Sequence, residues 1–247
     1  RVDPRVVEAM VPFFTQHYGN AASRQHRFGW VARDAVADAR AAVAALIGAR
    51  ASELIFTSGA TESNNLALKG VVEASRTRGN HIVTVQTEHR AILDPCASLE
   101  RQGMKVSYLP VREDGILTPA ALSAAIEPTT VLVTAMMANN ETGVLHPIDE
   151  LASLTRARGI PFHTDAAQAA GWVPINVETS GIDLLSLTAH KCHGPKGVGG
   201  LFVRHGVAVA PLIEGGGHES GLRSGTLNLP AIVGFGRAAS ICLNEMA

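Results

Sequence analysis

Residues 183–203 read Asp183-Leu-Leu-Ser-Leu-Thr-Ala-His-Lys-Cys-His-Gly-Pro-Lys-Gly-Val-Gly-Gly-Leu-Phe-Val203. Two short apolar runs, 183–187 and 199–203, flank a glycine-rich segment and are typical of buried β-strands. The segment between them is too short for a helical crossover, so we expect the two strands to be antiparallel. Lys191 follows the first strand, where its amine can turn into a pocket, and the glycines allow another group to approach the backbone closely.

Strand-like and helical segments alternate over the rest of the chain. The expected strands are Glu53–Phe56, His81–Gln86, Lys105–Leu109, Thr130–Met136, Ile160–Thr164, Asp183–Leu187 and Gly199–Val203. The expected helices are Gly29–Ile47, Asn64–Arg78, Ala91–Gln102, Pro119–Ile126, Pro147–Arg158 and Leu229–Met246. This alternation predicts a three-layer α/β fold, in which helices cover both faces of a mainly parallel sheet with one antiparallel strand. We expect residues 1–214 to form a large domain with an incomplete N-terminal edge, and residues 215–247 to form a connecting loop and the start of a small α/β domain.

Polar side chains follow several of the expected strands. In open α/β sheets ligands bind at the carboxyl ends of the strands, where the sequence places Thr87–His89, Asn139–Glu141, Asp165 and Lys191. A lysine in such a pocket can hold a carbonyl compound as a Schiff base, above all pyridoxal phosphate. Asp165 follows a buried strand and needs a cationic or donor partner, which the ring nitrogen of pyridoxal phosphate supplies. A helix N-cap is the ordinary alternative for such an aspartate.

Two further segments suit the same kind of ligand. Residues 57–65, Thr-Ser-Gly-Ala-Thr-Glu-Ser-Asn-Asn, precede an expected helix, and free N–H groups at a helix start make an anion site. A capping box between Thr61 and Asn64 is the ordinary interpretation, and both can hold at once. No Walker pattern is present, which disfavours a nucleotide phosphate. His89 is either a structural hydrogen-bonding group or a ring that stacks on a flat cofactor and moves protons.

Six motifs stand in a fixed order along the chain. They are Gly59-Ala-Thr-Glu-Ser-Asn-Asn65, Thr87-Glu-His-Arg-Ala91, Ala138-Asn-Asn-Glu-Thr-Gly143, His163-Thr-Asp-Ala-Ala-Gln168, Ala189-His-Lys-Cys-His-Gly-Pro-Lys-Gly197, and Gly215-Gly-Gly-His-Glu219 with Arg223-Ser-Gly-Thr226. In this order they resemble the cysteine desulfurases, which are class V, fold-type I enzymes dependent on pyridoxal phosphate. The similarity extends from Asp3 to the last residue and is greatest to the IscS/NifS subgroup.

The resemblance implies a role for each matched residue. Lys191 would bind pyridoxal 5'-phosphate covalently, Asp165 would contact its ring nitrogen, and His89 would stack over its ring. The side of the ring that carries the phenolic oxygen would be contacted by Asn140 and Gln168. The phosphate would be held by Ala60, Thr61, Thr188 and His190, and by Thr226 of a neighbouring subunit, which implies a homodimer with shared sites.

The implied reaction converts L-cysteine to L-alanine and leaves the sulfur on an enzyme cysteine as a persulfide, for an iron–sulfur scaffold or another sulfur-acceptor protein. Cys96, Cys192 and Cys242 do not match that cysteine, which the family carries beyond the position of Ala247, together with an arginine for the substrate carboxylate. We therefore expect a fragment that is inactive alone. We interpret all three cysteines as buried packing residues, with Cys192 facing away from Lys191 because neighbours on an extended chain point to opposite sides.

Other interpretations stay open at this stage. A zinc site without a paired Cys-x-x-Cys anchor could draw on His163, Asp165, His190, Cys192 and His193. A selenocysteine lyase or another class V aminotransferase-type enzyme would share the motifs present here. A catalytically inert scaffold for iron–sulfur assembly partners is the third alternative.

The composition of the chain indicates which classes of binding partner and which cellular compartment to expect. The net charge of −1 gives no reason to expect nucleic acid or an anionic membrane as a partner. No apolar run approaches the roughly 20 residues that a membrane helix needs, and no charged-then-apolar leader is visible. Three cysteines without regular spacing favour a reducing compartment, the cytoplasm or, in a eukaryote, the mitochondrion.

Overall fold

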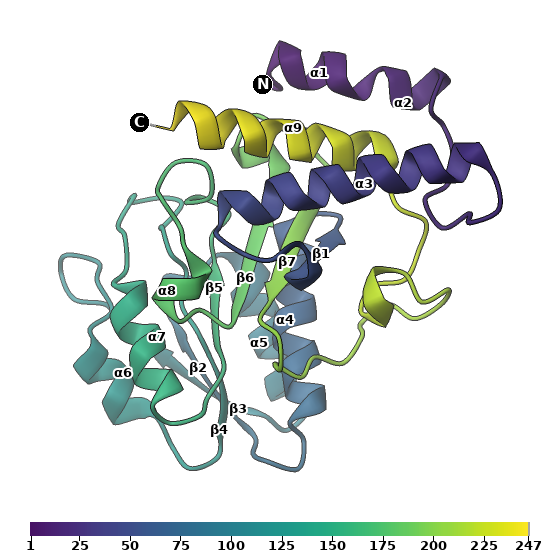
Figure 1. Cartoon of the computed structure of the whole chain (residues 1–247). Coiled ribbons are helices and arrows are strands. Elements are labelled where there is room, and N and C mark those ends of the chain that lie inside the picture. The colour runs from purple at the N-terminus through teal and green to yellow at the C-terminus, as the bar shows by residue number, and fades with distance from the viewer. Residues whose placement is uncertain (247) are drawn as a thin grey trace.

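A seven-stranded mixed sheet forms the centre of the molecule (Figure 1). The computed structural model describes residues 1–246. The strands are β1 (Leu54–Thr57), β2 (His81–Val85), β3 (Lys105–Leu109), β4 (Thr130–Thr134), β5 (Phe162–Asp165), β6 (Leu184–Thr188) and β7 (Gly199–Val203), in the spatial order β1-β7-β6-β5-β4-β2-β3. Strand β7 is antiparallel to both of its neighbours, and the other pairings are parallel. The predicted α/β class and the single reversed strand are confirmed.

Helices cover both faces of the sheet, as Figure 1 shows. They are α1 (Pro4–Met10), α2 (Pro12–Thr15), α3 (Arg27–Leu46), α4 (Ala60–Ala74), α5 (Arg90–Glu100), α6 (Pro119–Ala125), α7 (Ile148–Arg156), α8 (Val177–Ser180) and α9 (Leu229–Glu245). Single 3₁₀ turns lie at Ala51–Glu53, Ala189–Lys191 and Glu219–Gly221.

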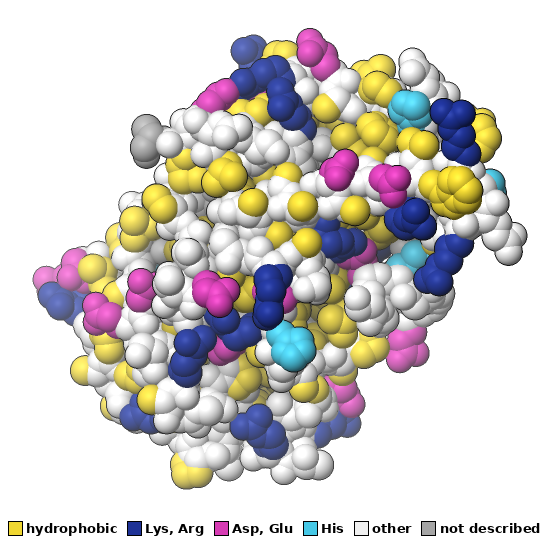
Figure 2. Space-filling model, in the orientation of Figure 1, with side chains coloured by type: hydrophobic (Ala, Val, Ile, Leu, Met, Phe, Trp, Pro, Cys, Tyr) yellow, Lys and Arg dark blue, Asp and Glu magenta, His cyan; other side chains and the backbone are white. Residues whose placement is uncertain are grey.

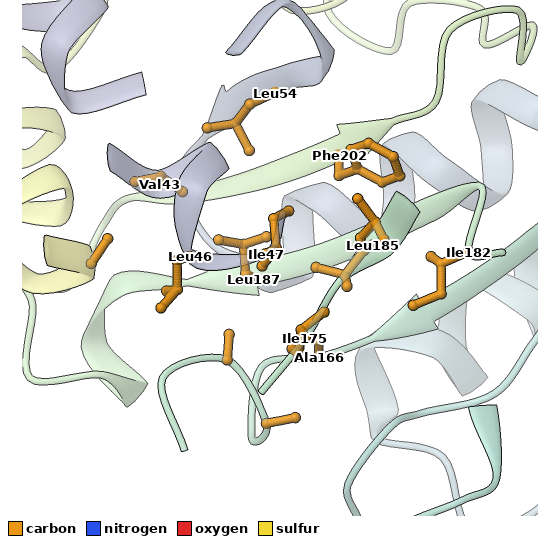
Figure 3. Close-up of a cluster of buried hydrophobic side chains, with 14 of the residues drawn as sticks. Val43, Leu46, Ile47, Leu54, Ala166, Ile175, Ile182, Leu185, Leu187 and Phe202 are labelled. Atoms are coloured by element: carbon orange, nitrogen blue, oxygen red, sulfur yellow. The ribbon is translucent and has the colours of Figure 1, made fainter. Parts of the chain in front are cut away.

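Side chains alternate between two hydrophobic clusters because successive residues of a strand point to opposite faces. Val83, Phe162 and Leu185 belong to the larger cluster, with α3, α7 and α9, while Ile82 and Leu184 belong to the smaller one, with α4 and α5. Figure 3 shows part of the larger cluster, where the end of α3 meets β6 and β7. Both faces are therefore buried, which explains why the strands read as apolar runs rather than as an alternating pattern.

Helix α9 lies beside α3 along one edge of the molecule (Figure 1). A Cβ atom on Gly236 would lie 2.6 Å from the Cα of Ala39, so only glycine allows these two helices to pack this closely. The buried face of α9 belongs to the larger cluster. The boundary expected at residue 215 stays a prediction.

The expected strands and helices are all present, and most of their ends shift by one or two residues. The largest shifts are in α4, which spans Ala60–Ala74 instead of the expected Asn64–Arg78. The reason is Gly59, whose φ of 150° lets the chain turn from β1 into the helix without a loop. The shift matters for function because it places the start of α4 directly after the end of strand β1.

Large hydrophobic side chains are exposed on the first helices. Phe14, Tyr18, Phe28 and Trp30 are each about half exposed or more, and Figure 2 shows hydrophobic side chains over the face that α1, α3 and α9 form. Exposed apolar surface of this kind marks interaction sites when it is contiguous. In the described part of the chain, no helix combines the length and the hydrophobicity that crossing a membrane requires.

Candidate functional site

A cavity of about 560 Å³ lies at the carboxyl ends of the central strands. Loops after β1, β2, β4, β5 and β6 all contribute to its wall. Of the residues predicted from the sequence, it is lined by Ala60, Thr61, His89, Asn140, Asp165, Gln168, Thr188, His190 and Lys191. The strand order thus brings together residues that lie more than 100 positions apart in the chain.

Thr226 lies outside this cavity. It borders a separate hollow of about 310 Å³ together with Phe14, Tyr18 and Leu227. The 3₁₀ turn that precedes it is held by a buried ion pair, in which Arg40 donates to both carboxylate oxygens of Glu219. Thr226 is therefore not positioned to contact a ligand bound in the larger cavity of its own chain, and its predicted contact with a neighbouring subunit stays a prediction.

The start of α4 forms one end of the cavity. Gly59 is its N-cap and no side chain of the described residues caps the helix, so the structure does not support the alternative of a capping box between Thr61 and Asn64. The start of α4 packs closely against β7 at Gly199, because a Cβ atom on Gly199 would lie 2.6 Å from the Cα of Gly59. An uncapped helix start carries free N–H groups and the positive end of the helix dipole, and both attract an anion.

Cationic and hydroxyl groups converge on the same end. The hydroxyl oxygen of Thr188 lies 3.0 Å from Nδ1 of His190 and also donates to the carbonyl of Val198. Burial lowers the pKa of His190, and the positive charges of Lys191 and Lys196 lower it further. Both lysines line the cavity. A bound anion would therefore offset the repulsion between their positive charges and a protonated His190. Lys196 was not among the residues predicted from the sequence.

Asp165 forms the floor of the cavity at the end of β5. Its Oδ1 accepts a hydrogen bond from the backbone N–H of Ala167 at 2.9 Å, and its Oδ2 accepts one from Nδ2 of Asn64 at 2.7 Å. Burial raises the pKa of Asp165, partly opposed by these two hydrogen bonds and by the charges of His89 and Lys191. Within residues 1–246 no Lys, Arg or His forms an ion pair with it. A buried carboxylate in this state is stabilised by a ligand that brings a positive charge or a donor.

His89 is the N-cap of α5. Its Nδ1 accepts a hydrogen bond from the N–H of Ala91 at 3.0 Å, which confirms a structural role and leaves the rest of the ring exposed at the cavity. Because Nδ1 accepts, the neutral ring carries its proton on Nε2. The capping bond therefore fixes both the orientation and the tautomer of the ring.

One buried and one exposed hydrogen bond hold the His89 turn against the end of β4. Glu88 Oε1 accepts from the N–H of Met136 at 2.6 Å, and Asn139 Nδ2 donates to the carbonyl of Thr87 at 3.0 Å. Asn139 also organises its own loop, since its Oδ1 accepts from the N–H groups of residues 141 and 142. This loop carries Asn140 into the cavity wall.

Sequence reasoning gave no specific role to Glu88 or Asn139 and considered Asn64 only as part of an alternative capping box. Each lies inside a quoted motif, so a signal existed. Glu88 and Asn139 flank residues with a clearer chemical role. Their partners are contributed by distant strands, and no local pattern identifies those partners.

The three cysteines lie away from the cavity. Cys96 and Cys192 are buried, as predicted, but Cys242 is only half-buried. Cys192 directs its thiol toward the carbonyl of Ala189, at 3.2 Å, and does not line the cavity. Within residues 1–246, no three His, Cys, Asp or Glu side chains come together in a way that could hold a metal ion, so the alternative zinc site has no geometric support.

Comparison with known proteins agrees with this geometry. The cysteine desulfurase IscS of Anaeromyxobacter sp. (strain Fw109-5) is 55% identical over 248 residues, which cover 100% of this chain and 61% of the relative. A solved NifS-like protein superposes with a TM-score of 0.96 and 42% identity, covering 99% of this chain and 67% of the other. The structure titled "SspA in complex with cysteine" gives a TM-score of 0.93 and 41% identity, covering 96% and 69%.

The chain spans about 61% of the length of the IscS relative. The model of the class-V aminotransferase family ("Aminotransferase class-V") matches residues 1–247. The chain has a mainly parallel sheet with an aspartate at the end of one strand and a lysine in the turn that follows another, and the family model matches it over its whole length. It therefore belongs to the class-V aminotransferase family.

Proposed function

We propose that the protein acts in a cysteine desulfurase reaction, in which L-cysteine loses its sulfur and becomes L-alanine. The observation that carries this proposal is the placement of Asp165 and Lys191 in one cavity, with an anion site at the start of α4. The names of the relatives support the reaction, because those matched over this chain are cysteine desulfurases. One similar structure is titled as a complex with cysteine, which supports the substrate class.

The class-V family implies pyridoxal 5'-phosphate as the cofactor, and the cavity fits this group. Asp165 is a desolvated carboxylate whose pKa is raised by burial, and it lines the cavity without an ion-pair partner in the described residues. A protonated ring nitrogen would provide the missing positive charge. The uncapped start of α4, with Thr188 and His190 beside it, suits a phosphate.

The side chains divide the remaining tasks. When bound, the cofactor withdraws electrons from the bonds at the substrate α-carbon. Lys191 would hold the cofactor covalently and, once substrate replaces it, move the α-proton. His89 would lie against the ring face, in the orientation that its bond to Ala91 fixes. Asn140 and Gln168, which line the same cavity, would contact the ring oxygen.

We propose that the sulfur passes to a thiol other than Cys96, Cys192 and Cys242, because none of the three lines the cavity. We also propose a homodimer. Two observations support it: Thr226 lies outside its own cavity, and the exposed side chains of Phe14 and Tyr18 line the same hollow as Thr226. A second copy that covered this hollow would bury those apolar side chains.

Lys191→Ala tests the assignment, with Lys196→Ala as the matched control because both lysines line the same cavity. Each variant is loaded with pyridoxal 5'-phosphate, treated with borohydride and digested, and the peptide that carries the cofactor is identified by mass. We expect the label on Lys191 in the wild type and in Lys196→Ala, and no label in Lys191→Ala. Label on Lys196 in the wild type would refute the assignment. The substrate is tested separately, by the alanine formed from L-cysteine.

A further inference from the structure

Cys192 and Cys242 lie against each other behind the turn that carries Lys191. Cys192 directly follows Lys191 and ends the 3₁₀ turn Ala189–Lys191, whereas Cys242 is on α9, 50 residues further along the chain. The Cys242 thiol donates a hydrogen bond to the carbonyl oxygen of Cys192, at 3.8 Å. The tertiary fold thus creates a pair of cysteines that the reaction proposed above does not use.

Gly171 holds this pair in place. A Cβ atom on Gly171 would lie 2.9 Å from Cβ of Cys192 and 3.0 Å from Sγ of Cys242. The glycine backbone therefore packs directly on both cysteines, and close packing keeps side chains in defined positions. The two thiols share one site, and neither points freely into solvent.

The two cysteines differ in accessibility and in ionisation. Cys242 is half-buried, while Cys192 is 2% exposed. The neighbouring Cys192 lowers the pKa of Cys242, although burial and the charge of Glu245 oppose this effect. The neighbouring Cys242, and then burial, raise the pKa of Cys192. Cys242 is therefore the thiol that ionises first and meets a small solute first, and the thiolate is the reactive form of cysteine.

We propose that Cys192 and Cys242 form an oxidation site, at which a hydroperoxide such as hydrogen peroxide produces an intramolecular disulfide. The Cys242 thiolate attacks one peroxide oxygen, the O–O bond breaks, and hydroxide leaves and takes up a proton to become water. The Cys192 thiol then attacks the sulfenic acid sulfur, the S–S bond forms, and the S–O oxygen leaves as a second water. Two thiols lose two electrons and two protons, and one peroxide is reduced to two waters.

The disulfide would tie the Lys191 turn covalently to α9. Trp172 is a fluorescent probe close to this disulfide. It directly follows Gly171, and its Nε1 donates to the carbonyl of Lys191 at 2.9 Å. Thiol reductants reverse the bond, so the modification is a reversible one.

The test oxidises the protein with hydrogen peroxide and maps its tryptic peptides without reduction. Cleavage after Lys191, Lys196 and Arg237 separates the two cysteines, so the disulfide appears as residues 192–196 joined to residues 238–247. Free thiols counted in denaturant should fall from three to one. Cys96→Ser is the matched control: Cys96 is buried within α5 away from the pair, so its removal should leave the joined peptide unchanged.

A second readout uses fluorescence. The Trp30→Phe variant leaves Trp172 as the remaining tryptophan, and its emission should fall on oxidation and recover with dithiothreitol. The additional substitutions Cys192→Ser or Cys242→Ser should each abolish the joined peptide and the reversible change in emission. A wild-type protein that keeps all three thiols, carries sulfinic acid on Cys242 without a joined peptide, or joins Cys96 instead would overturn the proposal.

Discussion

Glu88→Gln tests whether a second buried carboxyl group below the cavity keeps its proton. Glu88 is buried, its Oε1 accepts a single backbone hydrogen bond, from Met136, and its Oε2 has no partner among the described residues. Burial, and then the charge of Asp165, raise the pKa of Glu88 to about 8. Asp165 accepts two hydrogen bonds and Glu88 only one, so Asp165 is the member of the pair that ionises first.

The sign of the pH dependence follows from the raised pKa. Between the ordinary glutamate value of 4.5 and about 8, the folded state binds a proton on Glu88 that the unfolded chain has released. The stabilisation is complete below pH 4.5 and is lost as the pH rises through about 8. In that window the free energy of unfolding should fall by about 1.4 kcal/mol per pH unit, and by about 5 kcal/mol in total. A loss of this size is comparable to the whole stability of many domains.

The assay compares wild type and Glu88→Gln, both free of cofactor, by urea unfolding at pH 5, 6, 7 and 8. Glutamine keeps the carbonyl that accepts from Met136 but cannot ionise, so the difference between the two proteins isolates one proton. The exposed Glu113→Gln is the control for loss of a surface carboxyl group. We expect the wild type to lose stability relative to Glu88→Gln as the pH rises. Parallel profiles, or a difference of opposite sign, would refute the argument.

Three further predictions concern the residues around the cavity. Asp165→Asn should raise the unfolding temperature of the cofactor-free protein and weaken pyridoxal phosphate binding about tenfold or more, because it removes a buried charge that the ligand needs. Melting curves measure the first effect and a cofactor titration measures the second. A lower melting temperature would contradict the reasoning. His163 is fully buried, and burial lowers its pKa to about 3. The stability that the neutral His163 contributes is complete above pH 6.5, and the free energy of unfolding should fall by about 1.4 kcal/mol per pH unit as the pH falls below this value. The acid unfolding of His163→Gln should lack this pH dependence. Gly199→Ala should lower the free energy of unfolding by about 1–3 kcal/mol and weaken cofactor binding, because its Cβ would lie 2.6 Å from the Cα of Gly59. Gly200→Ala should lower the free energy of unfolding less, because its Cβ would come no closer than 3.1 Å to the flexible Leu54 side chain. Equal losses of stability in the two variants would be inconsistent with the steric argument.

The homology signal and the local patterns in the sequence were sufficient for the architecture. Strand-like runs of four to seven residues between helical segments predicted the strands, and the short connection between β6 and β7 predicted the reversed strand. Such features depend on residues that are close in sequence, within one strand or turn, so they can be predicted without a structure. The start of α4 was misjudged because a capping pattern and a direct turn at Gly59 use similar residues, and only the φ of Gly59 distinguishes them.

The sequence by itself determined most of the chemical groups predicted for the cavity, since Asp165 and Lys191 follow predicted strands and His89 lies just before a predicted helix. The tertiary structure alone decided their partners. Asn64 reaches Asp165 across 101 residues, Glu88 is buried near the same aspartate, and Cys192 meets Cys242 on another helix. Hydrogen bonds, burial and the resulting pKa shifts depend on which elements pack together in space, and packing between distant elements leaves no periodic trace in the chain.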